Sequence, residues 1–129
     1  MHDTDPRHRI DTVSTSRPVR VSIEGIEVAR STRVRELHEG ALPIRYYFPR
    51  ADVRLDLLRD SATVTRCPYK GTARYWTFAH EDLVVPDVAW SYDGEVEPDA
   101  RPIHEFLAFY NEVVDLEVDG VTVERPHPR

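Results

Sequence analysis

Short runs in which apolar and polar residues alternate, each closed by Gly, Pro or an acidic residue, most constrain the fold of this chain. At positions 21–28, Val-Ser-Ile-Glu-Gly-Ile-Glu-Val, apolar side chains recur at every second residue on both sides of Glu24-Gly25. Alternation is typical of a strand with one buried face, and an acidic residue followed by glycine tolerates the positive φ angles of a tight hairpin turn. We therefore predict a β-hairpin here.

The segment Leu-Glu-Val-Asp-Gly-Val-Thr-Val at 116–123 repeats this pattern, apolar for apolar and turn for turn. Two interpretations are open. The hairpins form a pseudo-symmetric pair that closes one sheet, or their likeness is the one that any two hairpins with an acidic-Gly turn share. The second is favoured.

Between the hairpins the same pattern predicts strands at 31–39, at 43–48 before Pro49, and at 63–67 and 71–79 on either side of a turn. Val53 and Leu57 fall at helical spacing, so one or two short helices are expected near 51–61. With 10 prolines and repeated short strands, the chain is predicted to be mainly β, as a small barrel or a folded sheet.

The length of 129 residues, 40% of them hydrophobic, suits a single domain with one core. Residues 1–16 are polar and lack helical or strand periodicity. We therefore expect a disordered N-terminal tail at 1–16 and one mostly β domain at 17–129.

Charge and hydropathy exclude several classes. The formal net charge is −6 and the arginines are interleaved with acids, so nucleic acid is not an expected partner. No stretch has the apolar length of a membrane span, and the N-terminus lacks the apolar segment of a signal peptide, so we expect a cytoplasmic protein. One cysteine can make neither an internal disulfide nor a multi-cysteine zinc site.

The only cysteine, Cys67, and the only lysine, Lys70, lie three positions apart in the segment Cys-Pro-Tyr-Lys-Gly. Pro68 disfavours helical geometry at Cys67 and Gly71 frees the backbone after Lys70, which predicts a turn that presents both side chains. An ammonium group near a thiol favours the thiolate, as a nucleophilic or redox cysteine requires. The base beside such a cysteine is usually a histidine; the candidates inside the domain are His38, His80 and His104, and no motif places them.

Two other interpretations of this segment remain open. Cysteine is among the residues most often buried, so Cys67 can simply pack beneath the turn. Lys70-Gly71-Thr72 can also hold an anion through an amine, a flexible backbone and a hydroxyl, although it lacks the glycines and the following helix of a phosphate-binding Walker loop.

Aromatic residues are concentrated between positions 46 and 92. Consecutive pairs, Tyr46-Tyr47 and Tyr75-Trp76, place rings on both faces of their strands. Core packing is the usual role of such residues, but these are more aromatic rings than a small core needs, and the additional rings can line a cleft for a planar or apolar ligand.

The motifs together resemble a bacterial and fungal family, domain of unknown function 427. The matching segments are Tyr-x-Pro-x-x-Asp-Val, then Cys-Pro-x-Lys-Gly-x-Ala-x-Tyr-Trp, Ala-Trp-x-Tyr and Ala-Phe-Tyr, in order over about residues 17–125. The resemblance implies a β-tent-like fold. The chain departs from the family at Asp93-Gly94, where a proline commonly follows Ala-Trp-x-Tyr.

The resemblance also bears on chemistry. The family carries a nucleotidyltransferase-like label, but this chain lacks the Gly-Ser followed by paired acidic metal ligands that such enzymes use. Many β-tent proteins hold structural zinc through two Cys-x-x-Cys pairs, which a single cysteine cannot supply. We expect neither a metal nor another cofactor. The family motif falls on thirteen positions, namely Tyr47, Pro49, Asp52, Cys67, Pro68, Lys70, Gly71, Tyr75, Trp76, Trp90, Tyr92, Phe109 and Tyr110.

Three functions are compatible with these residues. In the first, a β domain binds an anionic or aromatic small molecule in a cleft at the Cys-Pro-Tyr-Lys-Gly turn, with Lys70 as cationic anchor and Asp52 pairing with Lys70 or an arginine. The expected ligand-binding residues are Tyr47, Lys70, Gly71, Trp76, Trp90 and Tyr92. In the second, a small enzyme uses Cys67 as nucleophile or redox centre, with Lys70 and Asp52 as its other catalytic residues; Lys70 favours the thiolate, and Tyr47, Asp52 or a histidine transfers the proton. The third is a structural or interaction module, with a homodimer as a candidate assembly.

Overall fold

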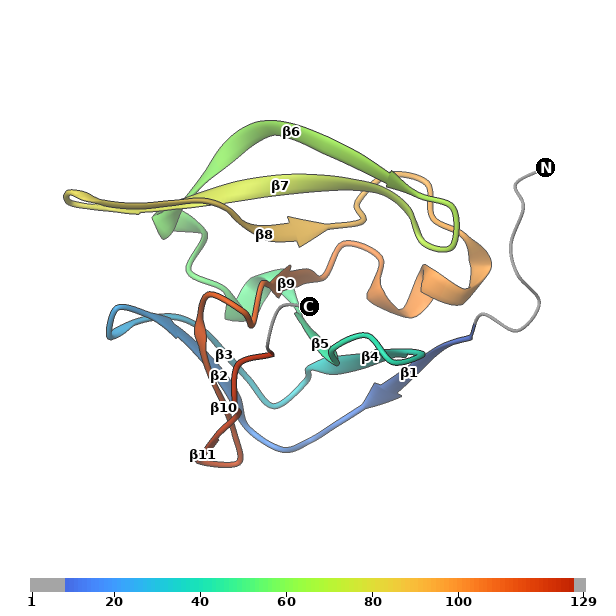
Figure 1. Ribbon diagram of the computed structural model, residues 1–129, viewed down its shortest axis with the longest axis horizontal. Helices are drawn as coiled ribbons and strands as arrows, with labels where there is room; N and C mark the ends of the chain where they lie inside the picture. The colour runs from blue at the N-terminus through green and yellow to red at the C-terminus, as the bar shows by residue number, and fades with distance from the viewer. Residues whose placement is uncertain (1–8, 127–129) are drawn as a thin grey trace.

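The computed structural model describes residues 9–126 as two antiparallel β-sheets with short 3₁₀ helices (Figure 1). The strands are β1 (Ile10–Ser14), β2 (Val19–Ile23), β3 (Ile26–Ser31), β4 (Arg35–Glu39), β5 (Arg45–Phe48), β6 (Leu58–Cys67), β7 (Gly71–His80), β8 (Leu83–Ser91), β9 (Leu107–Phe109), β10 (Asp115–Val118) and β11 (Val121–Thr122). The 3₁₀ helices are η1 (Arg50–Asp52), η2 (Leu55–Leu57) and η3 (Pro98–Ile103).

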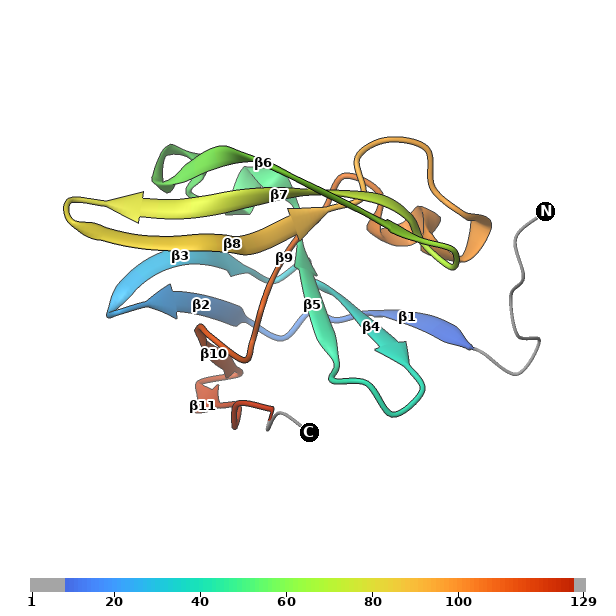
Figure 2. The ribbon, with the colours of Figure 1, turned by 45° about the horizontal axis from the view of Figure 1, so that its top comes forward.

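The larger sheet has seven strands in the order β1-β4-β5-β9-β8-β7-β6, and the smaller has four in the order β11-β10-β2-β3. Strands β6, β7 and β8 lie as one layer over β2 and β3, while β5 and β9 run between the layers (Figures 1 and 2). The larger sheet therefore bends from the upper layer down to β4 and β1. The prediction of a mainly β, folded-sheet domain is confirmed, and the sheets do not close into a barrel.

Both predicted hairpins form. The β2–β3 turn has Glu24 at φ 49° and Gly25 at φ 80°, and the β10–β11 turn has Asp119 at φ 56° and Gly120 at φ 80°. Strand β10 pairs with β2, so the two hairpins share the four-stranded sheet. The two hairpins therefore form one sheet, as the first interpretation predicted.

The N-terminal boundary also differs from the prediction. Residues 10–14, assigned to a disordered tail, form β1, which pairs with β4 from Ile10 opposite Glu39 to Ser14 opposite Arg35. An edge strand gains its backbone hydrogen bonds from one neighbour and has little apolar surface to bury, so its sequence carries no clear period. Residues 1–8 of the predicted tail, with His2 and His8, lie outside the described residues.

Alternation along the strands divides the core in two. The first cluster fills the space between the sheets and includes Phe48, Trp76, Phe78 and Phe109. The second lies on the opposite face of the larger sheet, and its buried members are Leu37, Tyr47, Ala73, Trp90, Tyr92, Ala100, Ile103 and Ala108. Consecutive aromatic residues therefore go to different clusters, as the sequence predicted.

The predicted helical turns at 51–61 are present as η1 and η2. Within residues 9–126, no helix has the length and apolarity required to cross a bilayer.

Candidate functional site

A row of paired residues across the larger sheet builds an aromatic pocket. Tyr47 on β5 lies opposite Ala108 on β9, Ala108 lies opposite Trp90 on β8, and Trp90 lies opposite Tyr75 on β7. Residues directly opposite each other on neighbouring strands point to the same face. Three aromatic rings and one methyl group therefore share a surface.

The small side chain of Ala108 lets Trp90 and Tyr47 meet across the intervening strand. Trp90 Nε1 donates a hydrogen bond of 3.0 Å to Tyr47 Oη, and the two rings lie edge to face with centroids 6.2 Å apart. Tyr47 is 1% exposed, and its burial raises the pKa of its hydroxyl. The indole and the phenol are thus held rigidly in one wall of the pocket.

The pocket has a volume of about 180 Å³. Its lining consists of Glu39, Leu42, Pro43, Arg45, Tyr47, Lys70, Tyr75, Trp90, Tyr92 and Tyr110. Five of these ten residues are aromatic. Burial is the main cause that raises the pKa of both Tyr92 and Tyr110, and for Tyr110 a hydrogen bond with Tyr75 adds to it.

The β6–β7 turn delivers Lys70 into this pocket. The Lys70 N–H donates to the Cys67 carbonyl at 3.3 Å, which closes the turn, and the Lys70 carbonyl accepts a hydrogen bond from the Glu97 N–H at 3.1 Å. Lys70 Nζ donates to Glu39 Oε1 at the end of β4. The two side chains are only 12% and 8% exposed, so the ion pair is largely withdrawn from water.

Gly71 is required at this turn for space as well as conformation. Its φ is +129°, and a Cβ atom placed on it would lie 2.8 Å from the Glu95 carbonyl oxygen and 3.2 Å from Val96 Cα. Gly71 and Val96 also form an isolated β-bridge. The glycine therefore lets the 95–97 segment pack against the turn that carries Lys70.

The second cation of the pocket, Arg45, is also paired. Its guanidinium donates two hydrogen bonds to the Glu112 carboxylate, at 2.6 and 2.9 Å, and lies 5.5 Å from the ring centroids of both Trp90 and Tyr110. The Arg45 hydrogen bond lowers the pKa of Glu112. Each positive charge that lines the pocket therefore has a carboxylate partner.

Of the residues predicted for the ligand site, Tyr47, Lys70, Trp90 and Tyr92 line the pocket together, and Gly71 supports the turn beside it. Trp76 does not join them, because its predecessor Tyr75 takes the pocket-facing position and Trp76 belongs to the core on the other face. The aromatic ring that β7 contributes to the pocket is therefore that of Tyr75.

Asp52 lies apart from Lys70. Its Oδ2 accepts hydrogen bonds from Ser31 Oγ at 2.6 Å and from Arg33 at 3.2 Å. Lys70 thus pairs with Glu39 and not with Asp52, whereas the alternative, an ion pair between Asp52 and an arginine, is present with Arg33. Asp52 is the last residue of η1 and is not among the residues that line the pocket with Lys70.

Cys67 is half-buried and packs against the core cluster that contains Tyr47 and Tyr92. The three histidines considered as its base have carboxylates within 4.0 Å instead, His38 with Glu36, His80 with Glu81 and His104 with Glu105. The Lys70 ammonium is directed to Glu39. Within the part of the chain that the structure describes, Lys70 and these three histidines are therefore all paired with carboxylates.

Six residues that line the pocket were absent from the predicted ligand site, namely Glu39, Leu42, Pro43, Arg45, Tyr75 and Tyr110, although Tyr75 and Tyr110 are positions of the family motif. Arg45 carried a usable signal, because it stands two residues before Tyr47 on the same strand and so shares its face. Glu39 carried none, since only the pairing of β4 with β5 brings it near.

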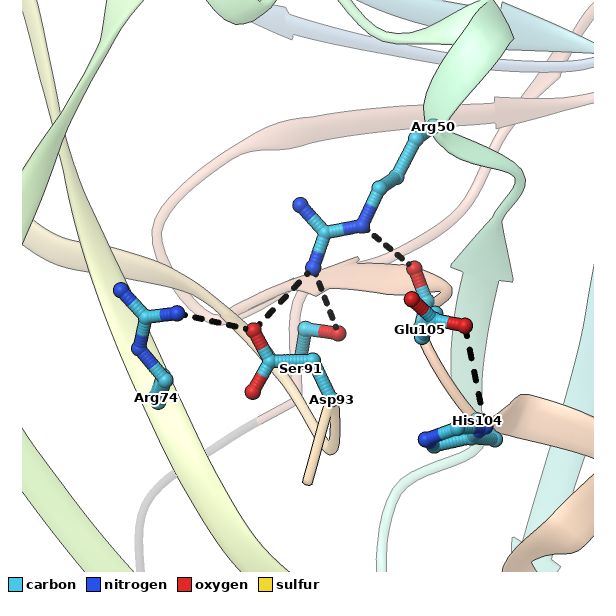
Figure 3. Close-up of polar contacts among 6 residues, drawn as sticks. All are labelled: Arg50, Arg74, Ser91, Asp93, His104 and Glu105. Carbon is cyan, nitrogen blue, oxygen red and sulfur yellow. Dashed lines mark hydrogen bonds and ion pairs between the residues drawn. The ribbon is translucent and has the colours of Figure 1, made fainter.

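A second polar cluster lies around Trp76. Arg50 and Arg74 both donate to Asp93, and Arg50 also donates to the Ser91 hydroxyl and to the Glu105 backbone carbonyl (Figure 3). Nowhere within residues 9–126 do three His, Cys, Asp or Glu side chains gather in a way that could hold a metal ion.

Fold and site together define a mainly β domain of two folded antiparallel sheets with an aromatic pocket on one face of the larger sheet. The family model for the domain of unknown function 427 matches residues 11–120. The chain therefore belongs to this family. A search of curated proteins finds no match to the sequence.

Proposed function

We propose that this domain binds a small molecule with a single aromatic ring and no net charge, in the pocket between Lys70 and Trp90. The observation that supports this most is the match between size and lining. The pocket of about 180 Å³ is walled by five aromatic rings. A cavity of about 150 Å³ holds one benzene ring.

The charges favour a neutral ligand. Lys70 is paired with Glu39, and Arg45 is paired with Glu112. An anion would have to compete with a carboxylate for either cation, and a cation would have to compete with Lys70 or Arg45. A neutral amide or hydroxyl group can instead exchange hydrogen bonds with the pocket rim without separating an ion pair.

The direct test is calorimetric titration with three ligands that share one ring and differ in charge, benzamide, benzoate and benzylamine. We expect benzamide to bind most tightly, with a dissociation constant in about the millimolar range for a ligand of this size. Equal or tighter binding of benzoate would support an anion anchored on Lys70 instead. Failure of all three to bind would contradict the proposal.

Two matched variants locate the binding. Leu42 lines the pocket and is 59% exposed, so Leu42→Trp should fill the entrance and weaken benzamide binding at least about tenfold. Val84 is 55% exposed on β8 and is not among the residues that line the pocket. Val84→Trp adds the same ring at that site and should leave binding unchanged. Equal effects of the two variants would show that benzamide binds elsewhere.

A further inference from the structure

Two arginines from different elements converge on one carboxylate. Arg50 comes from η1 and Arg74 from β7, and both guanidinium groups point toward Asp93, just after β8 (Figure 3). The distances to Asp93 Oδ2 are 3.5 Å from Arg50 Nη2 and 3.1 Å from Arg74 Nη1. The cluster is independent of the aromatic pocket, whose lining includes none of these three residues.

The guanidinium groups are positioned by more than Asp93. The Arg50 and Arg74 guanidinium groups lie 5.1 and 5.7 Å from the centroid of the Trp76 ring on β7, so both contact the same indole. Arg50 Nε also donates to the Glu105 carbonyl oxygen at 2.9 Å. Stacking on an aromatic face and a backbone hydrogen bond hold an arginine in place without using its outer nitrogens.

The hydrogen bonds from the two arginines to Asp93 are long. Charge-assisted hydrogen bonds between a guanidinium and a carboxylate usually measure about 2.7 to 2.9 Å. Arg45 and Glu112 make such a pair, with distances of 2.6 and 2.9 Å, whereas the contacts to Asp93 are 3.1 and 3.5 Å. Arg50 reaches the buried Ser91 hydroxyl only at 3.4 Å.

The cluster of Arg50, Arg74 and Asp93 has an excess of positive charge and is open to solvent. Two guanidinium groups facing one carboxylate leave an excess of one positive charge, in a chain whose formal net charge is −6. The Arg50 and Arg74 side chains are 33% and 51% exposed, so solvent reaches both. The carboxylate of Glu105, whose backbone carbonyl Arg50 contacts, is 63% exposed and lies 3.8 Å from His104 Nδ1.

We propose that Arg50 and Arg74 form a binding site for a phosphate group, either inorganic phosphate or a phosphate monoester, and that the Asp93 carboxylate occupies this site when no ligand is bound. A phosphate group carries more negative charge than a carboxylate and has three acceptor oxygens, so it can satisfy both guanidinium groups at short distance. Trp76 and the Glu105 carbonyl keep the arginines in place when the ligand displaces Asp93.

The test follows the side-chain Nε–H resonances of the arginines by NMR during titration with inorganic phosphate and, separately, glycerol 3-phosphate. Sodium chloride at equal ionic strength is the reference. We expect the Arg50 and Arg74 resonances to shift and saturate, while the resonance of Arg59, exposed on β6, does not. Saturation with only one of the two ligands identifies which source of phosphate the site prefers. The absence of saturable shifts at Arg50 and Arg74 with both ligands would overturn the proposal.

Variants separate a ligand site from a purely structural ion pair. Asp93→Asn removes the internal competitor and should tighten phosphate binding about three- to tenfold. Arg74→Gln should weaken it at least about tenfold, and Arg59→Gln should leave it unchanged. Binding no tighter in Asp93→Asn, or equally weakened in Arg59→Gln and Arg74→Gln, contradicts the proposal. If Asp93→Asn does not fold, the comparison of the two arginine variants decides alone.

Discussion

Lys70, in the β6–β7 turn, donates through its ammonium group to the carboxylate of Glu39, at the end of β4. Both side chains are nearly buried, and both line the aromatic pocket. The ion pair thus joins the turn that the sequence singled out to a strand that lies 31 residues earlier. It also neutralises the cation on which an anionic ligand would depend.

Breaking this pair from one side should destabilise the domain. Lys70→Met leaves a nearly buried carboxylate without its ammonium partner, and Glu39→Gln leaves the ammonium without its carboxylate. We expect each to lower the free energy of unfolding by about 2 to 4 kcal/mol, measured by urea denaturation. The double variant should lose clearly less than the sum of the two. Strict additivity would contradict a direct interaction.

Substitution of Gly71 should disturb the same turn. An alanine Cβ would lie 2.8 Å from the Glu95 carbonyl oxygen, at a φ of +129° that side chains rarely adopt. We expect Gly71→Ala to cost about 2 kcal/mol or more in the free energy of unfolding. Gly94→Ala is the matched control, because a Cβ atom there meets nothing within 4 Å. Equal costs at the two glycines would refute the packing argument.

The hydrogen bond from Trp90 to Tyr47 should contribute more to the free energy of unfolding than a hydrogen bond of a partly exposed hydroxyl does. Tyr47→Phe removes the acceptor and leaves a buried indole N–H unpaired, which should cost about 1 to 3 kcal/mol. Tyr75→Phe removes a hydroxyl that bonds Thr65 Oγ1 at 2.9 Å and also bonds Tyr110, but Tyr75 is only partly buried, so water can replace these partners and the loss should be smaller. Thermal denaturation of both variants measures the difference, and a smaller loss for Tyr47→Phe would be the contrary result.

Alkaline pH should unfold the domain through its buried tyrosines. Burial raises the pKa of Tyr47, Tyr92 and Tyr110, so the folded chain keeps these phenolic protons when the unfolded chain loses them. Stability is therefore unaffected well below the unfolded pKa of about 10 and falls as the pH rises above it.

The ionisation of the tyrosines can be followed directly by absorbance at 295 nm, which detects tyrosinate. We expect a late group of tyrosines to ionise only together with loss of the fold, and Tyr92→Phe to reduce the pH dependence of stability by about 1.4 kcal/mol per pH unit. If all six tyrosines ionise while the domain remains folded, the burial argument is incorrect.

Local patterns predicted most of the strands, because alternation and acidic-Gly or Pro-Gly turns act within a few residues. The hairpin at Glu24-Gly25 and the strand pair around Lys70 needed no long-range information. The site depended on pairing between distant strands. Glu39 reaches Lys70 because β4 joins the larger sheet through β5, and nothing near Glu39 in the sequence indicates this.

The assignment of Trp76 shows the same limit in one residue. Sequence reasoning recognised that Tyr75 and Trp76 point to opposite faces, but it could not decide which face carries the pocket. The register of β7 against β8 sets Tyr75 opposite Trp90, and this leaves Trp76 between the sheets. Aromatic content therefore indicated three rings that line the pocket, Tyr47, Trp90 and Tyr92, without deciding which ring of β7 joins them.

The two tryptophans make the central claim directly measurable. Trp90 lines the pocket and Trp76 lies on the other face of the sheet, so their indole Nε1–H resonances report on separate sites in one NMR spectrum. Titration of the ¹⁵N-labelled protein with benzamide should shift the Trp90 resonance in a saturable way and leave that of Trp76 in place. A Trp90 resonance that stays fixed, or a shift confined to Trp76, would contradict a ligand site in this pocket.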